Sequence, residues 1–211
     1  MQSVAPVIGR RARNRQRVQE RLYEAGLSLI TAQGYDRTSI EEIAERADVA
    51  RGTFFNYFQR KEDLVTEWGE RRRVRLADAL LAGGSPRGDG LGARLEHFMT
   101  VLGRVSEEER EVTVAMLTAW VKAGRPLLEE PYVAETFGRI LAEGAVRGEL
   151  RDGVGPQQVG EVLRDLYVGT LYRWSREVPV AERGALEAEL LAVLRLLVEG
   201  VVARRDPEVT P

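Results

Sequence analysis

Apolar side chains recur every three or four residues along most of the chain, which is the spacing that places them on one face of an α-helix. The pattern predicts helices throughout and no convincing strand. The predicted helices cover residues 13–33, 40–47, 51–58, 60–82, 91–105, 107–123, 131–148, 156–177 and 181–204. Glycines and prolines separate them, and the glycine-rich stretch 83–90 predicts a loop. We therefore expect an all-α fold of about nine helices.

Residues 38–61 predict two short helices joined by a tight turn, an arrangement found in DNA-binding proteins. Ser39 is placed to cap the first helix, and Glu42, three residues later, can complete a capping box. Phe54 and Phe58 lie four residues apart in the second helix, so both rings point to its inner side. The outer side of the second helix is then left to meet another molecule.

That outer side carries one arginine, one glycine, one hydroxyl, one amide and two aromatic rings. Solubility explains such a set poorly, whereas the major groove of DNA offers base edges and phosphates for the polar groups. Arginine pairs with guanine and asparagine with adenine through two hydrogen bonds, each pair worth about 1–3 kcal/mol of discrimination. Arg51, Thr53 and Asn56 are therefore the candidates for base edges, and a helical pair without a nucleic-acid partner is the alternative. The candidate DNA-binding residues of this helix are Arg51, Gly52, Thr53, Phe55, Asn56 and Tyr57.

These residues resemble the N-terminal domain of TetR-type transcriptional regulators. The family's pattern is an I-A-x-x-A-x-V helix followed by x-x-G-T-hydrophobic-aromatic-x-aromatic-F-x-x-K. This chain has IAERADV at 43–49 and GTFFNYFQRK at 52–61, and the match extends over roughly residues 13–75. The resemblance implies an N-terminal arm and three-helix helix-turn-helix DNA-binding domain at 1–59. A helical ligand-binding and dimerisation domain would follow at 60–211.

The chain departs from the family's pattern at three places. Phe55 stands where many relatives have tyrosine, so one phosphate hydrogen bond is lost. Ala50 stands where a serine often caps the recognition helix, and a poor cap costs about 0.5–2 kcal/mol of helix stability. Glu41 and Glu42 bring negative charge near the DNA, which favours the start of their helix but repels phosphate.

Further DNA contacts are expected next to the second helix. Lys61 lies at the start of the long helix, where its charge and free backbone N–H groups would face a phosphate, and an ordinary surface lysine is the alternative. The Tyr57 hydroxyl would reach a phosphate or pack beside Phe54. Thr38 and Ser39 divide two tasks between them, capping the helix and contacting the DNA backbone.

The charge of the whole chain argues against a nucleic-acid partner, since the net charge is -2 and the pI is near 5.7. The distribution of the charge along the chain, however, favours a nucleic-acid partner. Residues 1–73 hold 14 Arg or Lys against 11 Asp or Glu, whereas residues 74–211 hold 17 against 22. Five arginines stand within residues 10–17, a density that suits an arm along phosphates or in a minor groove. Arg13 and Arg17 are the candidates from this cluster, and a solvated, frayed terminus is the alternative.

A homodimer is expected from the last two helices. Ten of the 13 residues from 190 to 202 are apolar, more than one core contact requires. A twofold axis brings a patch against its own copy, so two helices from each chain would form a four-helix bundle, as the resemblance also implies. A helix buried within its own domain is the alternative. The candidate interface residues are Val159, Leu163, Leu166, Leu190, Leu194, Leu197 and Val201. Such a dimer would read palindromic double-stranded DNA with half-sites about 34–36 Å apart, or a multiple of that.

The resemblance also implies a small-molecule effector bound in a pocket of the larger, acidic domain. The function implied is a ligand-responsive repressor, released from its operator when the ligand favours the non-binding conformation by about 1–3 kcal/mol or more. An apolar or amphipathic ligand would suit the candidate lining, although plain core packing is the alternative for each residue. The candidates are Phe98, Leu102, Met116, Trp120, Phe137, Leu141 and Tyr167. A DNA-binding regulator without an inducer is the alternative function.

Catalytic, cofactor and membrane chemistry find little support. The chain has no cysteine, and its one histidine, His97, lacks a spaced partner for a metal. Neither G-x-S-x-G nor G-x-x-x-x-G-K-[ST] occurs. We expect no catalytic residue, no cofactor and no metal, with an all-helical enzyme and a nucleoid-type binder without sequence preference as alternatives. No secretory apolar core and no apolar run of 18 residues is present, so we expect a cytoplasmic protein without a membrane partner.

Overall fold

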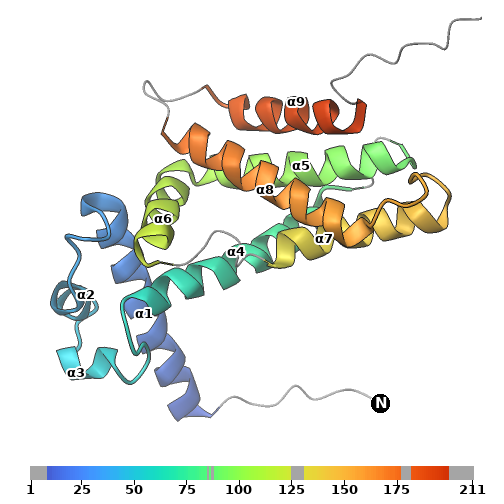
Figure 1. The fold of residues 1–211 in the computed structure, drawn as a ribbon. Helices are drawn as coiled ribbons and strands as arrows, with labels where there is room; N and C mark the ends of the chain where they lie inside the picture. The colour runs from blue at the N-terminus through green and yellow to red at the C-terminus, as the bar shows by residue number, and fades with distance from the viewer. Residues whose placement is uncertain (1–8, 85, 87, 125–130, 177–181, 200–211) are drawn as a thin grey trace, which may run out of the picture. The chain divides into compact units, whose positions relative to one another are not determined.

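The computed structural model describes residues 9–84, 86, 88–124, 131–176 and 182–199. Every regular element among these residues is an α-helix, which confirms the predicted all-α fold (Figure 1). The helices are α1 (Arg10–Gln33), α2 (Ile40–Arg46), α3 (Arg51–Phe54), α4 (Glu62–Ala82), α5 (Leu91–Glu108), α6 (Arg110–Lys122), α7 (Pro131–Val146), α8 (Pro156–Ser175) and α9 (Ala185–Glu199).

Local signals in the sequence set several helix ends. Gly34 follows α1 with φ 87°, and its N–H donates to the carbonyl of Ile30 at 2.9 Å. Glycine adopts this left-handed conformation without strain, so α1 ends there. Pro156 stands at the start of α8, where its missing N–H would have had no partner within the helix.

The described contacts divide the chain into two units. The first unit comprises Met1–Glu70 and Val114–Pro126, and the second comprises Arg71–Thr113 and Leu127–Pro211. One boundary falls inside α4 and another inside α6, while the third, between residues 126 and 127, lies outside the described residues. The functional boundary predicted between residues 59 and 60 lies within the first unit and stays a prediction.

The core of the first unit holds the two short helices in place. α1 packs on α2 and α2 on α3, with Leu22, Ile43 and Phe54 fully buried among them. α1 also lies close to α4, since a Cβ added at Gly26 would lie 2.7 Å from a methyl carbon of Leu64. Each such buried side chain contributes roughly 1.5–3 kcal/mol. Because helices as short as α2 and α3 are marginal alone, α1 and α4 brace them.

The second unit is built on two close helix pairs, α7 with α8 and α5 with α9, as Figure 1 shows. The backbones of α7 and α8 nearly touch, because a Cβ added at Gly160 would lie 2.7 Å from the carbonyl oxygen of Ala134. Gly103 of α5 lies in the same way against the backbone of Glu187 in α9, at 2.9 Å. These glycines fix where each pair crosses.

Candidate nucleic-acid interface

The start of α2 is held by the predicted capping box. The Ser39 hydroxyl accepts the backbone N–H of Glu42 at 3.2 Å, and the Glu42 carboxylate accepts the backbone N–H of Ser39 at 2.8 Å. Hydrogen bonds from the Ser39 N–H, the Ser39 hydroxyl and Gln33 hold the pKa of Glu42 below its ordinary value. The capping role of Ser39 is therefore confirmed, and α2 begins at a fixed residue.

The turn between α2 and α3 reverses the chain through a left-handed residue. Asp48 has φ 52°, which an aspartate tolerates better than most residues, and the N–H of Val49 donates to the carbonyl of Ala44 at 3.0 Å. Ile43, Ala44 and Ala47 are buried, as their spacing predicts. The turn thus brings α3 into contact with α2.

The recognition helix is shorter than predicted. The sequence predicts a helix over 51–58, whereas α3 ends at Phe54 and residues 55–57 form turns. Three backbone hydrogen bonds in this segment span only three residues, including Asn56 N–H to Thr53 and Tyr57 N–H to Phe54. Ala50 supplies no side-chain cap for the first turn. The segment 51–58 is therefore held mainly by its packing.

The inner and outer sides of this segment are those predicted. Phe54 and Phe58 are buried, and their ring centroids lie 5.6 Å apart. Arg51, Gly52, Phe55 and Asn56 are exposed, while Thr53 and Tyr57 are half-buried. The structure therefore presents a guanidinium and an amide to solvent from one short segment.

Two arginines lie against the aromatic rings of this segment. The Arg51 guanidinium lies 5.4 Å from the centre of the Phe55 ring, and that of Arg15 lies 5.6 Å from the centre of the Tyr57 ring. Arg51 also donates its Nε–H to the carboxylate of Glu41. The sequence did not reveal the pairings of Arg15 with Tyr57 and of Arg51 with Glu41, because these partners stand on different elements.

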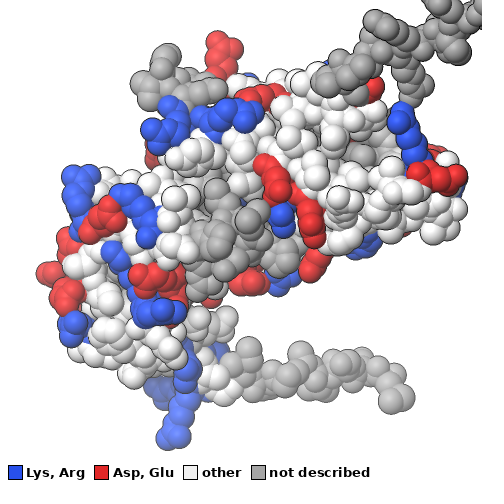
Figure 2. Space-filling model, in the orientation of Figure 1, with Lys and Arg blue, Asp and Glu red and all other residues white. Residues whose placement is uncertain are grey.

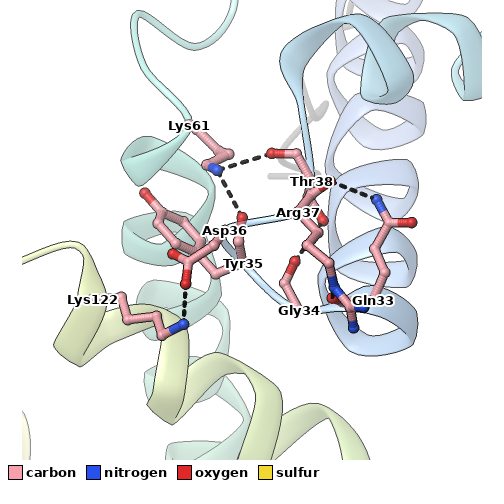
Figure 3. Close-up of polar contacts among 8 residues, drawn as sticks. All are labelled: Gln33, Gly34, Tyr35, Asp36, Arg37, Thr38, Lys61 and Lys122. Carbon is pink, nitrogen blue, oxygen red and sulfur yellow. Dashed lines mark hydrogen bonds and ion pairs between the residues drawn. The ribbon is translucent and has the colours of Figure 1, made fainter.

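Lys61 and Thr38 lie outside the segment 51–58, and both have hydrogen-bond partners within the protein. The Lys61 ammonium donates to the carbonyl oxygens of Tyr35 at 2.7 Å and Thr38 at 2.9 Å, and lies 4.0 Å from the centre of the Tyr35 ring (Figure 3). Thr38 is only 2% exposed, and its hydroxyl donates to the carbonyl of Gly34. Both residues hold the turn at 34–38, and their contact with DNA stays a prediction.

The same turn has a further partner, from α6. Lys122 is paired with Asp36, as Figure 3 shows, and Trp120 meets Trp68 edge to face with centroids 6.0 Å apart. The pKa of the Tyr35 phenol is raised, mainly by burial and secondly by its hydrogen bond to Glu62. Tyr35 therefore stays neutral, and its hydroxyl donates to the Glu62 carboxylate at 2.9 Å. No local sequence signal could have placed Lys122 here, since 86 residues separate it from Asp36.

The arginine cluster near the start of the chain lies on a helix. α1 begins at Arg10, earlier than the predicted residue 13, so the cluster occupies exposed helical turns. Arg10, Arg13 and Arg17 line a shallow groove there, and Figure 2 shows basic side chains projecting from the start of α1. Spacings of three and four residues place these three side chains on one face of α1.

Comparison with known proteins identifies this arrangement. The model of the tetR family of bacterial regulatory proteins matches residues 22–67. The chain is 31% identical over 166 residues to the HTH-type transcriptional regulator YvdT of Bacillus subtilis, covering 74% of this chain and 81% of that protein. It is 29% identical over 160 residues to the HTH-type transcriptional repressor KstR of Mycolicibacterium smegmatis, covering 74% and 75%. The chain belongs to the TetR family.

The structure of a TetR-family repressor, FadR of Thermus thermophilus in complex with lauroyl-CoA, is also similar. Identity is 28% and the TM-score 0.66, over 92% of this chain and 100% of that one. The predicted family and the predicted role as a DNA-binding transcriptional repressor are confirmed by these matches. Regulators of this family bind DNA and small-molecule effectors.

The seven predicted ligand-binding residues of this TetR-family chain are all buried, but they lie in both units. Met116 and Trp120 belong to the first unit. The other five lie in the second, where the Phe98 and Phe137 rings meet with centroids 4.7 Å apart. A cavity of about 690 Å³ in the second unit is lined elsewhere, by residues of α4, α5 and α9 such as His97 and Leu191. The predicted pocket therefore stays a prediction.

The predicted dimer residues divide by burial. Leu163, Leu190 and Leu194 are fully buried within one chain, so they pack in its own core. Val159 and Leu166 are half-buried, Leu197 is 41% exposed, and Val201 lies outside the described residues. Other exposed apolar side chains of α8 and α9 are Val162 and Tyr172, which were not predicted, and Leu196 and Val198 of the predicted apolar run 190–202. Apolar periodicity marks a helix face as buried without saying what covers it.

Two further properties of the described residues concern other functions. No described helix is both long and apolar enough to cross a membrane. No group of three or more His, Cys, Asp or Glu within the described part of the chain is arranged to hold a metal ion.

Proposed function

We propose that this TetR-family repressor acts in the cytoplasm as a homodimer, binds an inverted-repeat operator, and leaves it when an amphipathic small molecule binds the second unit. The outer side of α3 and the turns after it carries the proposal. Arg51 and Asn56 are exposed there, while Phe54 and Phe58 fix the same segment to the core. A guanidinium and an amide held on a rigid support fit direct readout of guanine and adenine in a major groove.

Other residues of the segment would place it on the DNA backbone. Open space in front of Gly52 would let the backbone of the DNA approach closely, since nothing lies within 4 Å of a Cβ added there. The exposed Phe55 ring would pack on a sugar, Thr53 would meet a base edge, and the Tyr57 hydroxyl would donate to a phosphate.

The surroundings of the segment would supply further phosphate contacts. Lys61 donates to two carbonyl oxygens, and an ammonium has three donors, so one remains for a phosphate. Arg13 and Arg17 would follow the phosphates from α1. Ser39 would contact the backbone near its capping box, and Thr38 would act through the turn that it holds.

The proposed dimer would form through the exposed apolar side chains of α8 and α9. Leu197, Leu196 and Val198 are exposed on α9, and Val162 and Tyr172 on α8. Twofold symmetry would place each patch against its copy, and two reading segments would then meet successive major grooves about 34–36 Å apart. The half-buried Val159 and Leu166 would lie at the edge of this interface.

The proposed effector is an acyl-thioester or a molecule of similar amphipathic character. Support comes from the Thermus thermophilus repressor, whose structure contains lauroyl-CoA and is similar to this chain over its full length. The aromatic and aliphatic side chains of Phe98, Leu102, Phe137, Leu141 and Tyr167 in the second unit suit an acyl chain. Binding would favour the form released from DNA by about 1–3 kcal/mol.

The test is selection of operator DNA from a random pool by the full-length protein. The selected fragment then competes with random DNA over a salt series, where a nonspecific binder shows no preference. We expect an inverted repeat, reduced discrimination at one or two of its positions in Asn56→Ala, and release by lauroyl-CoA. Failure to select any symmetric sequence would overturn the proposal of operator binding. If the protein stays on the operator in the presence of acyl-CoAs of every chain length, only the proposal of an acyl-thioester effector would be overturned.

A further inference from the structure

The guanidinium of Arg51 has a hydrogen-bond partner at one edge and an aromatic ring at one face. It is the first residue of α3, while its partner Glu41 is the second residue of α2. The Nε–H of Arg51 donates to a carboxylate oxygen of Glu41, and the ring of Phe55 lies 5.4 Å from the centre of the guanidinium. All three residues belong to the first unit.

This contact leaves the recognition edge of the guanidinium available. A guanidinium carries five N–H donors in one plane, one on Nε and four on the two terminal nitrogens. The Glu41 carboxylate takes the Nε donor. The terminal pair is the fork that can reach O6 and N7 of guanine together. Glu41 therefore occupies the donor that two-point recognition of guanine does not need.

Glu41 is itself well placed as a support. It stands in the first turn of a helix whose start is fixed by the Ser39 capping box, where negative charge is favoured. A hydrogen bond from its own backbone N–H and another from Arg51 hold the pKa of Glu41 below its ordinary value, so it is ionised at neutral pH.

Two effects of Glu41 on DNA binding must be separated. Its negative charge repels phosphate, which weakens binding to every sequence alike. Its hydrogen bond to Arg51 acts on one side chain, so it can change discrimination only at the base pair which that side chain reads. A long arginine loses much rotamer freedom when it is ordered, and a side chain ordered in advance loses less on binding.

We infer that Glu41 is a specificity-determining positioning residue, which holds Arg51 by Nε so that its terminal nitrogens face a guanine in the operator. This inference rests on the proposed function. It assigns to the carboxylate of α2 a role in base selection, although that carboxylate touches no base.

The test compares Glu41→Gln with Glu45→Gln in the full-length protein. Glu45 is exposed on the same helix one turn later, so both variants lose one negative charge near the same place. Binding is measured to the selected operator and to the full set of its single-base substitutions, and Arg51→Ala identifies the base pair that Arg51 reads. Melting curves check that each variant is folded.

We expect discrimination between bases to fall about 5-fold in Glu41→Gln, only at the base pair that Arg51 reads. This is a part of the discrimination that a two-point contact supplies. Glu45→Gln should change affinity for all sequences equally. A uniform change in Glu41→Gln, like that in Glu45→Gln, would overturn the inference while leaving the proposed function standing. Unaltered discrimination in Arg51→Ala would also overturn it. Failure to select an operator would remove the proposed function and this inference together.

Discussion

The start of α2 in the first unit and the buried centre of the second unit differ in how far along the chain their polar contacts reach. In the first unit, the capping box joins Ser39 to Glu42, three residues later. In the second, the buried guanidinium of Arg72 donates to the hydroxyl of Tyr167, 95 residues away, at 2.8 Å. Short-range contacts can be recognised in a sequence, whereas long-range ones arise only from the packing of distant helices. Function is therefore easier to read from the first unit than from the second.

The units also differ in where their chemistry lies. The candidate DNA-binding groups of the first unit are mostly exposed on a small, firmly packed support. In the second unit, Arg72 is 7% exposed, and its hydroxyl partners Ser106 and Tyr167 are buried with it. A change on the surface of the first unit should alter binding, while a change inside the second should alter stability.

The largest effect on DNA binding is expected from a charge placed on the exposed apolar side chains of α9 in the second unit. Leu197→Arg would place an unpaired charge in the proposed dimer interface, which costs several kcal/mol. We expect a monomer whose affinity for the operator is lowered about 100-fold or more, since 1.4 kcal/mol is about tenfold. Sedimentation and DNA titration measure both effects. Leu81→Arg is the control, because Leu81 is an even more exposed leucine, at 84%, on α4. A Leu197→Arg protein that remained dimeric would exclude this patch as the interface.

The close crossing of α7 and α8 should be the next most sensitive feature. In Gly160→Ala the new methyl would lie 2.7 Å from the carbonyl oxygen of Ala134, and backbone atoms cannot move aside easily. We expect a loss of about 2 kcal/mol or more in the free energy of unfolding in urea. Gly169→Ala on the same helix meets only the end of Arg173 at 3.9 Å, and should be neutral or gain up to about 1 kcal/mol. Equal effects in the two variants would contradict the close crossing.

Removal of one buried hydroxyl tests the long-range polar contact directly. Tyr167→Phe would take a hydrogen-bond partner from Arg72 without changing the ring. We expect a loss of about 1.5 kcal/mol of stability, because the buried guanidinium of Arg72 loses one of its hydrogen-bond acceptors. Tyr132→Phe, on α7 of the same unit and only half-buried, should change stability by less than about 0.5 kcal/mol. Similar small changes for both tyrosines would show that the contact contributes little.

The smallest effect is expected at the turn of the first unit. Lys61→Ala removes two hydrogen bonds to carbonyl oxygens and should cost about 1 kcal/mol of stability. If Lys61 also meets a phosphate, the slope of log affinity against log salt should fall by about 1, equally for all sequences. Lys122→Ala is the control, since its exposed pair with Asp36 contributes at most about 1 kcal/mol and no phosphate contact. An unchanged salt slope in Lys61→Ala would show that Lys61 stabilises the turn and does not contact a phosphate.

Much of the fold could be predicted from the sequence, because its signals are local. The glycine after α1, the capping box of α2 and the spacing of Phe54 and Phe58 each act within five residues or fewer. One exception was the length of α3. Its sequence carries helical spacing of aromatic rings but no cap at Ala50, and the rings are held by the core rather than by a regular helix.

The candidate site could be predicted in composition but not in contacts. The exposed positions of Arg51 and Asn56 follow from the buried positions of their neighbours. The support that Glu41 gives to Arg51 depends on the angle between two helices, and the two carbonyl partners of Lys61 depend on how α4 meets a turn 23 and 26 residues earlier. Neither set of contacts can be predicted from the spacing of residue types along the chain.

The positions of the tryptophans have a practical consequence. Trp68 and Trp120 lie edge to face in the first unit, whereas Trp174 lies in the second beneath the guanidinium of Arg110, 4.1 Å from its ring centre. The chain has 3 tryptophans in all. An indole beside another indole and an indole beneath a cation fluoresce differently. The native chain thus carries an intrinsic optical reporter for each unit, and Trp174→Phe would let emission follow the first unit alone, without an attached dye.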